Sequence, residues 1–312
     1  MSLNATLTTD LEDEGSYGHS QDTFIHFTTA AAVAILLCLI GLVGNIIVLW
    51  NLCLKMKKST FTAYSINLAV AYFIVLLISV CILILYINTM NNPNPNFEGK
   101  DSLFLFLEIV HDSALYSGMF ILTAISLERC ISVMFPVWHS CHRPKRLSVI
   151  MCVTLWSIGC IESLFENLVC TPDTFVTPTS QCTAIQLITF ALAIIVCLPI
   201  MVTSSIILLI HIKKKFHQQV STELYAFIII AVIVFILSVI PFNFLWLLIY
   251  FHLIPTDFQT IAFFFASIYA IVINCTIIPY LYIIAEIKWK TKPLRHESDS
   301  KTDITTCKTD NI

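Results

Sequence analysis

Charged residues are scarce in this chain: only 12% of its 312 residues are Asp, Glu, Lys or Arg, while 57% are hydrophobic. A soluble globular protein carries roughly 25% charged residues. Half that fraction over so long a chain excludes an ordinary soluble domain. It predicts a protein whose surface mostly faces lipid.

Features of enzymes and transporters are also missing. The chain has 7 glycines but no glycine-rich phosphate loop, and its His, Cys, Asp and Glu residues show no metal-ligand spacing. No nucleophile, base and orienting partner can be assembled, so we expect no enzyme, no cofactor and no metal. The seventh apolar stretch has no lysine, which excludes a retinal Schiff base. No internal repeat is visible, which argues against a repeat-built transporter, and we expect no nucleic-acid partner.

Long apolar stretches are what the sequence has in place of these features. About 20 apolar residues span a bilayer as a helix, which satisfies its own backbone hydrogen bonds. Seven stretches qualify, near residues 25–53, 62–89, 102–134, 147–169, 183–212, 223–252 and 258–284. The fold class predicted is an all-α membrane protein, a seven-transmembrane helix bundle. We expect an extracellular N-terminal segment (1–24), the membrane domain (25–284) and a cytoplasmic tail (285–312).

The positive charges give this bundle an expected orientation. Lys and Arg residues that flank membrane spans stay on the cytoplasmic side. Of the 17 such residues, all but Lys100 fall at alternate ends of the spans, which places the N-terminus outside and the C-terminus inside. The acidic N-terminus lacks the basic region of a signal peptide, so the first stretch is expected to be an uncleaved helix.

Two cysteines differ from the other ten. Cys170 and Cys182 bracket the second extracellular connection, in an oxidising compartment, and a disulfide between them is predicted. Cysteines within the spans are expected to pack as small apolar residues. Asn4 begins an Asn-Ala-Thr sequon on the extracellular side and is the expected glycosylation site.

Four acids lie inside the spans, where ionisable residues are costly and are functional candidates by default. They form two pairs with i, i+4 spacing, each on one helix face near the outer end: Glu108 with Asp112, and Glu162 with Glu166. His111 lies on nearly the same turn as Glu108. These residues predict a shallow acidic pocket for a cationic peptide or amine. The alternative is that the acids form hydrogen bonds between helices or face water in an open cup.

The inner end of the third stretch carries Glu128-Arg129-Cys130. An arginine at that depth needs a carboxylate partner, and Glu128 is adjacent. A partner protein that enters from the cytoplasm can break this pair and expose Arg129. The pattern alone is short, and its surroundings make it more specific.

These surroundings carry a resemblance to a known family. The run from Leu122 to Val133 and its continuation from Phe135 to Lys145 closely resemble the third-helix exit and second intracellular loop of the Mas-related G-protein-coupled receptors. Further landmarks of rhodopsin-like receptors occur along the spans: Gly44-Asn45, Leu155-Trp156, Pro199, Phe235, Pro241, and Pro279 with Tyr282. The resemblance implies a multi-pass plasma-membrane receptor for an extracellular ligand. Its cytoplasmic partner would be a heterotrimeric G protein, contacted by Arg129, Tyr282 and the loop from Pro136 to Lys145.

The resemblance also bears on the outer residues. Phe104 stands where most rhodopsin-like receptors have a cysteine, and Mas-related receptors bridge the fourth and fifth helices instead, as Cys170 and Cys182 would. Some members bind cations through an acid at the position of Glu166, and a second family acid is replaced by Gln186. Val239 stands in place of the usual sixth-helix tryptophan.

Two departures concern the interior of the bundle. Tyr72 replaces the second-helix aspartate of most such receptors, and Ile278 replaces the asparagine of the seventh-helix Asn-Pro-x-x-Tyr motif. Without them we expect no sodium regulation and a shifted resting equilibrium. Pro293 predicts that the usual membrane-parallel eighth helix is short or absent. The alternative functions are a weakly coupling decoy or heteromer partner and, less favoured, a small membrane transporter.

Overall fold

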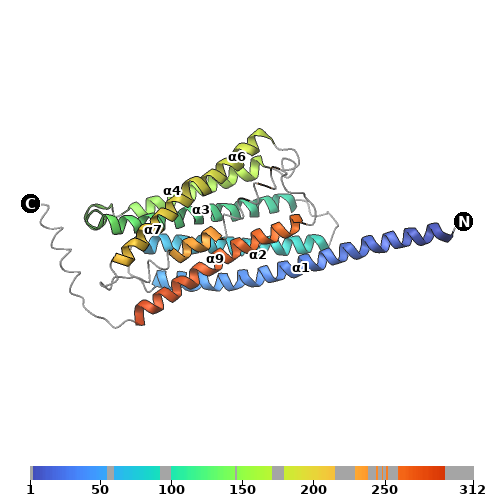
Figure 1. The fold of residues 1–312 in the computed structure, drawn as a ribbon, viewed down its shortest axis with the longest axis horizontal. Helices are drawn as coiled ribbons and strands as arrows, with labels where there is room; N and C mark the ends of the chain where they lie inside the picture. The colour runs from blue at the N-terminus through green and yellow to red at the C-terminus, as the bar shows by residue number, and fades with distance from the viewer. Residues whose placement is uncertain are drawn as a thin grey trace, which may run out of the picture.

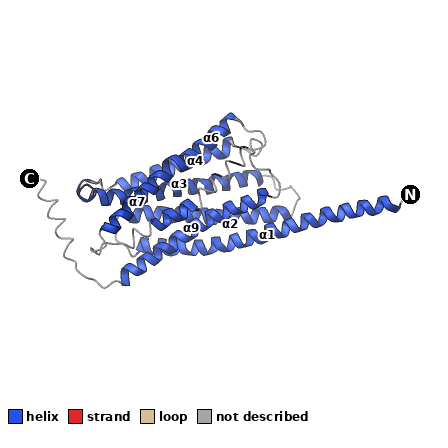
Figure 2. Ribbon diagram, in the orientation of Figure 1, coloured by secondary structure: helices blue, strands red, loops and turns tan. Residues whose placement is uncertain are grey.

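The chain folds into a bundle of long helices (Figures 1 and 2). The computed structural model describes residues 3–54, 60–91, 100–144, 146–170, 179–214, 229–237 and 259–291, with residues 244, 248 and 251. Within these ranges the side chains of residues 3–23 and of several segment ends are not described. The described residues contain no strand.

The helices follow one another along the chain with short connections. Their bounds are α1 Leu3–Leu54, α2 Thr60–Asn91, α3 Lys100–Met134, η1 Trp138–His142, α4 Leu147–Val169, α6 Ser180–Ala191, η2 Leu192–Cys197, α7 Leu198–Lys214 and α9 Gln259–Thr291. The two η elements are π-helical turns.

The predicted fold class, a membrane helix bundle, is confirmed. Six helices in the described part of the chain are long and apolar enough to cross a membrane: Phe24–Leu54, Thr62–Thr89, Ser102–Met134, Leu147–Val169, Ser180–His211 and Phe265–Ile284. The remaining expected span, near 223–252, lies mostly outside the described residues. Each described span lies within a few residues of a predicted stretch, because a membrane helix must be apolar over its whole length.

Helix α1 differs from the expected boundary at residue 24. It begins at Leu3 and continues without a break to Leu54, and its N-terminal part projects beyond the bundle (Figure 1). No proline interrupts residues 3–54, so the backbone can stay helical outside the apolar stretch. The segment before Phe24 is therefore a helical extension of the first span.

Helix α3 lies at the centre of the bundle. It packs against α2, α4 and α7, while α1 packs against α2 and α9. Gly159 on α4 allows a close approach: a Cβ atom there would lie 2.7 Å from the backbone nitrogen of Ser117 on α3. Small residues at such crossings allow membrane helices to pack closely.

The fifth span is helical throughout but is not a uniform α-helix. Helices α6 and α7 are joined by the π-helical turn η2, Leu192–Cys197, directly before Pro199. Proline has no N–H to donate to the carbonyl four residues earlier, and a local widening of the helix accommodates this. At the other end of the chain α9 runs as one helix to Thr291, so residues 285–291 extend the seventh span. Pro293 lies outside the described residues.

Candidate functional site

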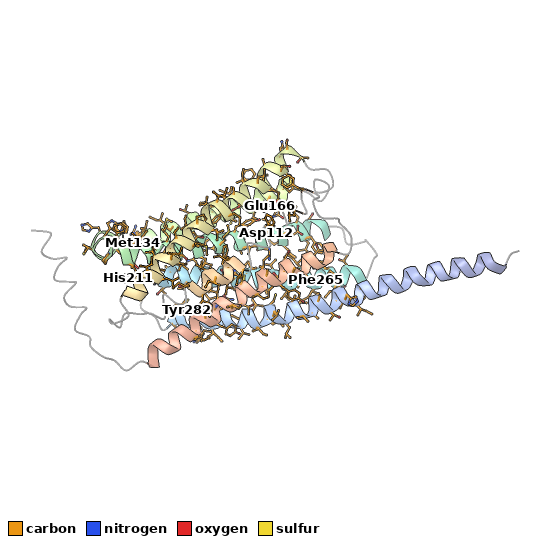
Figure 3. The ribbon with its side chains drawn as sticks, viewed as in Figure 1. Asp112, Met134, Glu166, His211, Phe265 and Tyr282 are labelled. Atoms are coloured by element: carbon orange, nitrogen blue, oxygen red, sulfur yellow. A yellow bond between two sulfur atoms is a disulfide. The ribbon has the colours of Figure 1, made fainter. Side chains whose placement is uncertain are left out.

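The candidate ligand site is at the outer end of α3 and α4. Figure 3 shows Asp112 and Glu166 close together, well separated along the bundle from Met134 and His211. Asp112 comes from α3 and Glu166 from α4, and α6 adds polar groups to the same region. The structure thus brings both predicted acid pairs into one polar region.

Glu166 is tied to two neighbouring helices. Its Oε2 accepts a hydrogen bond from the Tyr116 hydroxyl of α3, and its Oε1 accepts one from Gln186 Nε2 of α6 at 3.0 Å. Both carboxylate oxygens therefore already have protein donors. Glu166 links three helices just below the disulfide.

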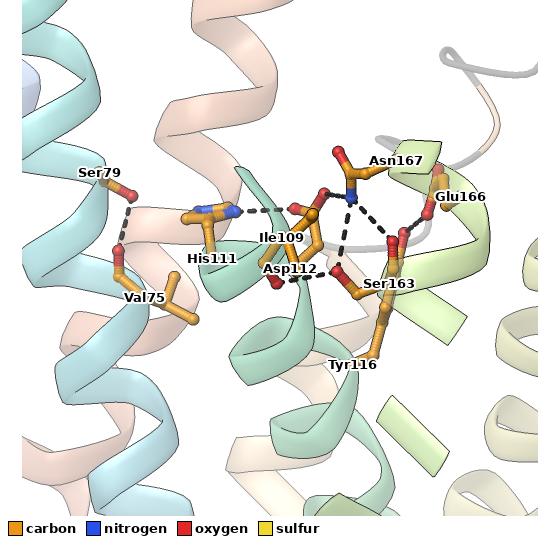
Figure 4. A network of polar contacts seen from close by, with 9 residues as sticks. All are labelled: Val75, Ser79, Ile109, His111, Asp112, Tyr116, Ser163, Glu166 and Asn167. Atoms are coloured by element: carbon orange, nitrogen blue, oxygen red, sulfur yellow. Dashed lines mark hydrogen bonds and ion pairs between the residues drawn. The ribbon is translucent and has the colours of Figure 1, made fainter. Parts of the chain in front are cut away.

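Asp112 is satisfied in a similar way (Figure 4). Its Oδ2 accepts from Asn167 Nδ2 at 3.0 Å, and its Oδ1 lies 2.9 Å from His111 Nδ1. Ser163 adds a further link between α4 and α3, because its hydroxyl donates to the carbonyl of Ile109 at 2.8 Å. The interhelical hydrogen bonds that the sequence left as an alternative thus exist for Asp112 and Glu166.

The other two acids have different surroundings. Glu108 is half-buried one turn from Asp112, and its charged neighbours are Asp112 and His111. Glu162 is only 9% exposed, and neither of its carboxylate oxygens has a hydrogen-bond partner among the described residues. The buried Thr189 hydroxyl of α6 lies beside it but lacks hydrogen-bond geometry.

The predicted disulfide is present. Cys170 at the end of α4 is bonded to Cys182 in the first turn of α6, with their Cα atoms 5.1 Å apart. Both residues are buried. Eight other cysteines in the described part of the chain are free thiols: Cys38, Cys53, Cys81, Cys130, Cys152, Cys160, Cys197 and Cys275. The side chain of Asn4 lies outside the described residues.

At the inner end of α3, Glu128 interacts with the second intracellular loop. Its Oε1 lies 2.8 Å from Arg143 Nε and 2.9 Å from His139 Nε2, and Arg143 also donates to the Ser148 hydroxyl at 3.0 Å. The sequence suggested the adjacent Arg129 as the partner of Glu128; the ion pairs found for it are with the loop instead. Arg129 is partly buried one residue further along α3.

The interior departures lie together between α1, α2, α3 and α9. Tyr72, only 2% exposed, has its hydroxyl beside Asn274 and its ring against Gly118. Tyr72, Ile278 and Tyr282 line a cavity of about 20 Å³, which is room for one water molecule. A bulky phenol therefore occupies the position of the usual aspartate.

Several residues of these sites were not anticipated from the sequence. Tyr116 and Asn167 are each four residues from a residue that was or could have been singled out, Asp112 and Ser163, so the same i, i+4 spacing places them on the polar face. His139 and Arg143 had no such signal, because their contact with Glu128 depends on how the loop folds back. Gln186 was noted only as a replaced family acid.

Comparison with known proteins places these features in a family. The chain matches the model of the 7 transmembrane receptor (rhodopsin family) over residues 44–282. It is 34% identical over 212 residues to the Proto-oncogene Mas of Mus musculus, covering 68% of this chain and 64% of that protein. It is 31% identical over 245 residues to Mas-related G-protein coupled receptor member X2 of Mus musculus, covering 77% and 68%. It is 28% identical over 265 residues to member D of Macaca fascicularis, covering 84% and 81%. The match thus spans a little under two thirds of the length of the Mas proteins.

Proposed function

Because this chain belongs to the Mas-related branch of the rhodopsin-like seven-transmembrane receptors, we propose that it binds an extracellular ligand and activates a heterotrimeric G protein. The family is one of receptors rather than enzymes, and its members are multi-pass proteins of the plasma membrane. The observation that carries the proposal is the family match, which covers the spans from Gly44 to Tyr282.

The outer polar region supports a cationic ligand. Four carboxylates gather near the ends of α3 and α4, and the described Lys and Arg side chains, Arg129, Arg143 and Arg146, belong to the other end of these helices. Like-charged carboxylates in a partly desolvated site favour an arriving cation. A peptide or amine that approaches from outside would meet Glu108 and Asp112 on one wall and Glu162 and Glu166 on the other.

The inner end supports a role in coupling. Glu128 is engaged by Arg143 and His139 of the loop, so the carboxylate next to Arg129 on α3 is already neutralised by loop cations. A G protein that binds between α3, α7 and α9 would contact Arg129, Tyr282 and this loop together. In this proposal the Glu128 ion pairs set the position of the loop, and Arg129 makes the contact that the partner requires.

The proposal is tested by nucleotide exchange. The receptor in lipid nanodiscs is assayed with each G-protein family for GTP-analogue uptake, without ligand and with cationic peptides and amines. We expect exchange with at least one family, and a loss of about tenfold or more for Arg129→Ala. Arg146→Ala removes an exposed cation from the same face and should leave exchange near the wild-type rate. Equal rates for wild type and Arg129→Ala would overturn the coupling role of Arg129.

One observation favours a second function, that of a weakly coupling decoy or heteromer partner. Tyr72 and Ile278 are both buried and together replace two polar groups of the usual interior network. If those groups are needed to reach the active state, the receptor would bind its ligand without efficient coupling. Ligand binding with no exchange in any G-protein family would favour this function.

A further inference from the structure

We propose that Glu162 is the binding residue for the protonated primary amine of a ligand, and that Glu166 is a structural link. Both acids belong to the same face of α4, one turn apart, so the sequence does not separate them. Their surroundings do. The inference rests on the proposed receptor function for the extracellular origin of the amine.

The first step concerns the acceptors that remain open. Glu166 has both oxygens occupied by Tyr116 and Gln186, and Asp112 has both occupied by His111 and Asn167. A cation at either residue would compete with existing protein donors. Of the acids on α4, only Glu162 offers two carboxylate oxygens without a partner among the described residues.

The second step concerns burial. Glu162 is more than nine-tenths buried, and its polar neighbours are the Thr189 hydroxyl and the Glu166 carboxyl rather than a cation. A buried carboxylate without a partner is strongly unfavourable, so the group needs either a proton or a cation. On the expected outer side the sequence provides only Lys100, which belongs to the first turn of α3. The partner therefore comes from outside the protein.

The third step identifies the chemistry of the cation. Both Glu162 oxygens and the Thr189 Oγ1 are buried without hydrogen bonds, which gives three acceptors side by side. A primary ammonium has three N–H donors on one compact charge and can satisfy all three. A quaternary ammonium has no N–H, and a sodium ion prefers more oxygen ligands than three. The site therefore fits a primary amine such as a lysine side chain or a free alkylamine.

The depth of the site adds a requirement. Glu162 is seven residues before Val169, the last residue of α4, which is about 10 Å along the helix. An ammonium that enters from the outer end must therefore be carried on an alkyl chain. A four-carbon chain, as in lysine and butylamine, has the required form.

The test measures binding without a G protein. Wild-type receptor in nanodiscs is heated with a thiol-reactive dye that reports exposure of its buried cysteines. Butylammonium and N-acetyl-lysine methylamide are titrated against tetramethylammonium and sodium chloride at equal concentration. A ligand that binds only the folded state raises the unfolding midpoint. We expect both primary amines to raise it saturably and the two control cations not to.

Variants then identify the residue. Glu162→Gln should raise the apparent dissociation constant of the amine about tenfold or more, and Thr189→Val about threefold or more, as hydrogen bonds to a charged group are lost. Glu162→Gln removes an unpaired charge and should not lower the midpoint of the free receptor. Glu166→Gln is the matched control: it lowers that midpoint but leaves the amine-induced shift intact.

The outcomes are distinguishable. The inference is wrong if wild type shows no shift, if sodium or tetramethylammonium gives the same shift, or if the shift survives Glu162→Gln and is lost in Glu166→Gln. A shift with either amine supports it, and the stronger of the two identifies the source as peptide or free amine. Failure of nucleotide exchange alongside a Glu162-dependent shift would count against G-protein coupling and not against this site.

Discussion

Tyr116 makes the contact that gives Glu166 its structural role. Its hydroxyl, on α3, donates to the Glu166 carboxylate of α4, while Gln186 of α6 holds the other oxygen. Hydrogen bonds to charged groups are worth more than those between neutral groups. A single phenol therefore makes a large contribution to the joining of three helices.

We expect Tyr116→Phe to lower the free energy of unfolding by about 1.5–3 kcal/mol, because a bond to a charged acceptor is lost. The measurement is denaturant unfolding of the purified receptor in detergent. Tyr280→Phe is the matched control, since the Tyr280 hydroxyl also joins two helices but donates to a neutral acceptor, the Ile40 carbonyl, at 2.9 Å. Its loss should cost about 0.5–1.5 kcal/mol. Equal losses in the two variants would show that Glu166 contributes no special strength.

At the scale of helices, the closest approach among the glycine contacts of α3 and α4 is at Gly159. A Cβ atom there would meet Ser117 Oγ and, at 2.7 Å, its backbone nitrogen. The serine side chain can rotate away, but the backbone cannot. The spacing of the two helices, and with it the position of both acid pairs, therefore depends on the absence of a side chain at residue 159.

Gly159→Ala should accordingly lower the free energy of unfolding by about 1–3 kcal/mol, the usual cost of overpacking. It should also weaken amine binding, because α4 carries Glu162. Ser157→Ala is the control, since Ser157 is exposed on the lipid side of the same helix. The measurements are the unfolding and titration experiments described above. A Gly159→Ala variant as stable as Ser157→Ala would mean that the helices can separate at little cost.

The sequence predicted helices better than contacts. The span at 147–169 was predicted with the bounds that α4 has, Leu147–Val169, since lipid requires an uninterrupted apolar helix between a basic and a polar end. The start of α1 was missed because helicity outside the membrane leaves no apolar signal. The acid face was found by its spacing. The division of labour between Glu162 and Glu166 was not, since it depends on donors from α3 and α6.

At the scale of the whole molecule, the orientation is the property that every functional argument assumes. The charge pattern predicts an extracellular N-terminus, and Asn4 then meets the glycosylation machinery. Removal of N-linked glycans should increase the electrophoretic mobility of the receptor from mammalian cells. Asn4→Gln should already migrate at the faster position. The sequon at Asn274 lies in α9, buried in the bundle, so Asn274→Gln should keep the glycan. An unglycosylated wild type that reaches the surface with its C-terminus outside would reverse the topology.

The Cys170–Cys182 bridge has a mechanical consequence. One covalent bond and, one turn below it, the Glu166–Gln186 contact fix the outer ends of α4 and α6 at two heights. Two bodies joined at two points cannot slide past each other; they can only tilt together. A push at Glu162, on the α4 side of this joint, is then passed as a rotation down the fifth span. The π-helical turn before Pro199 is where that lever can bend.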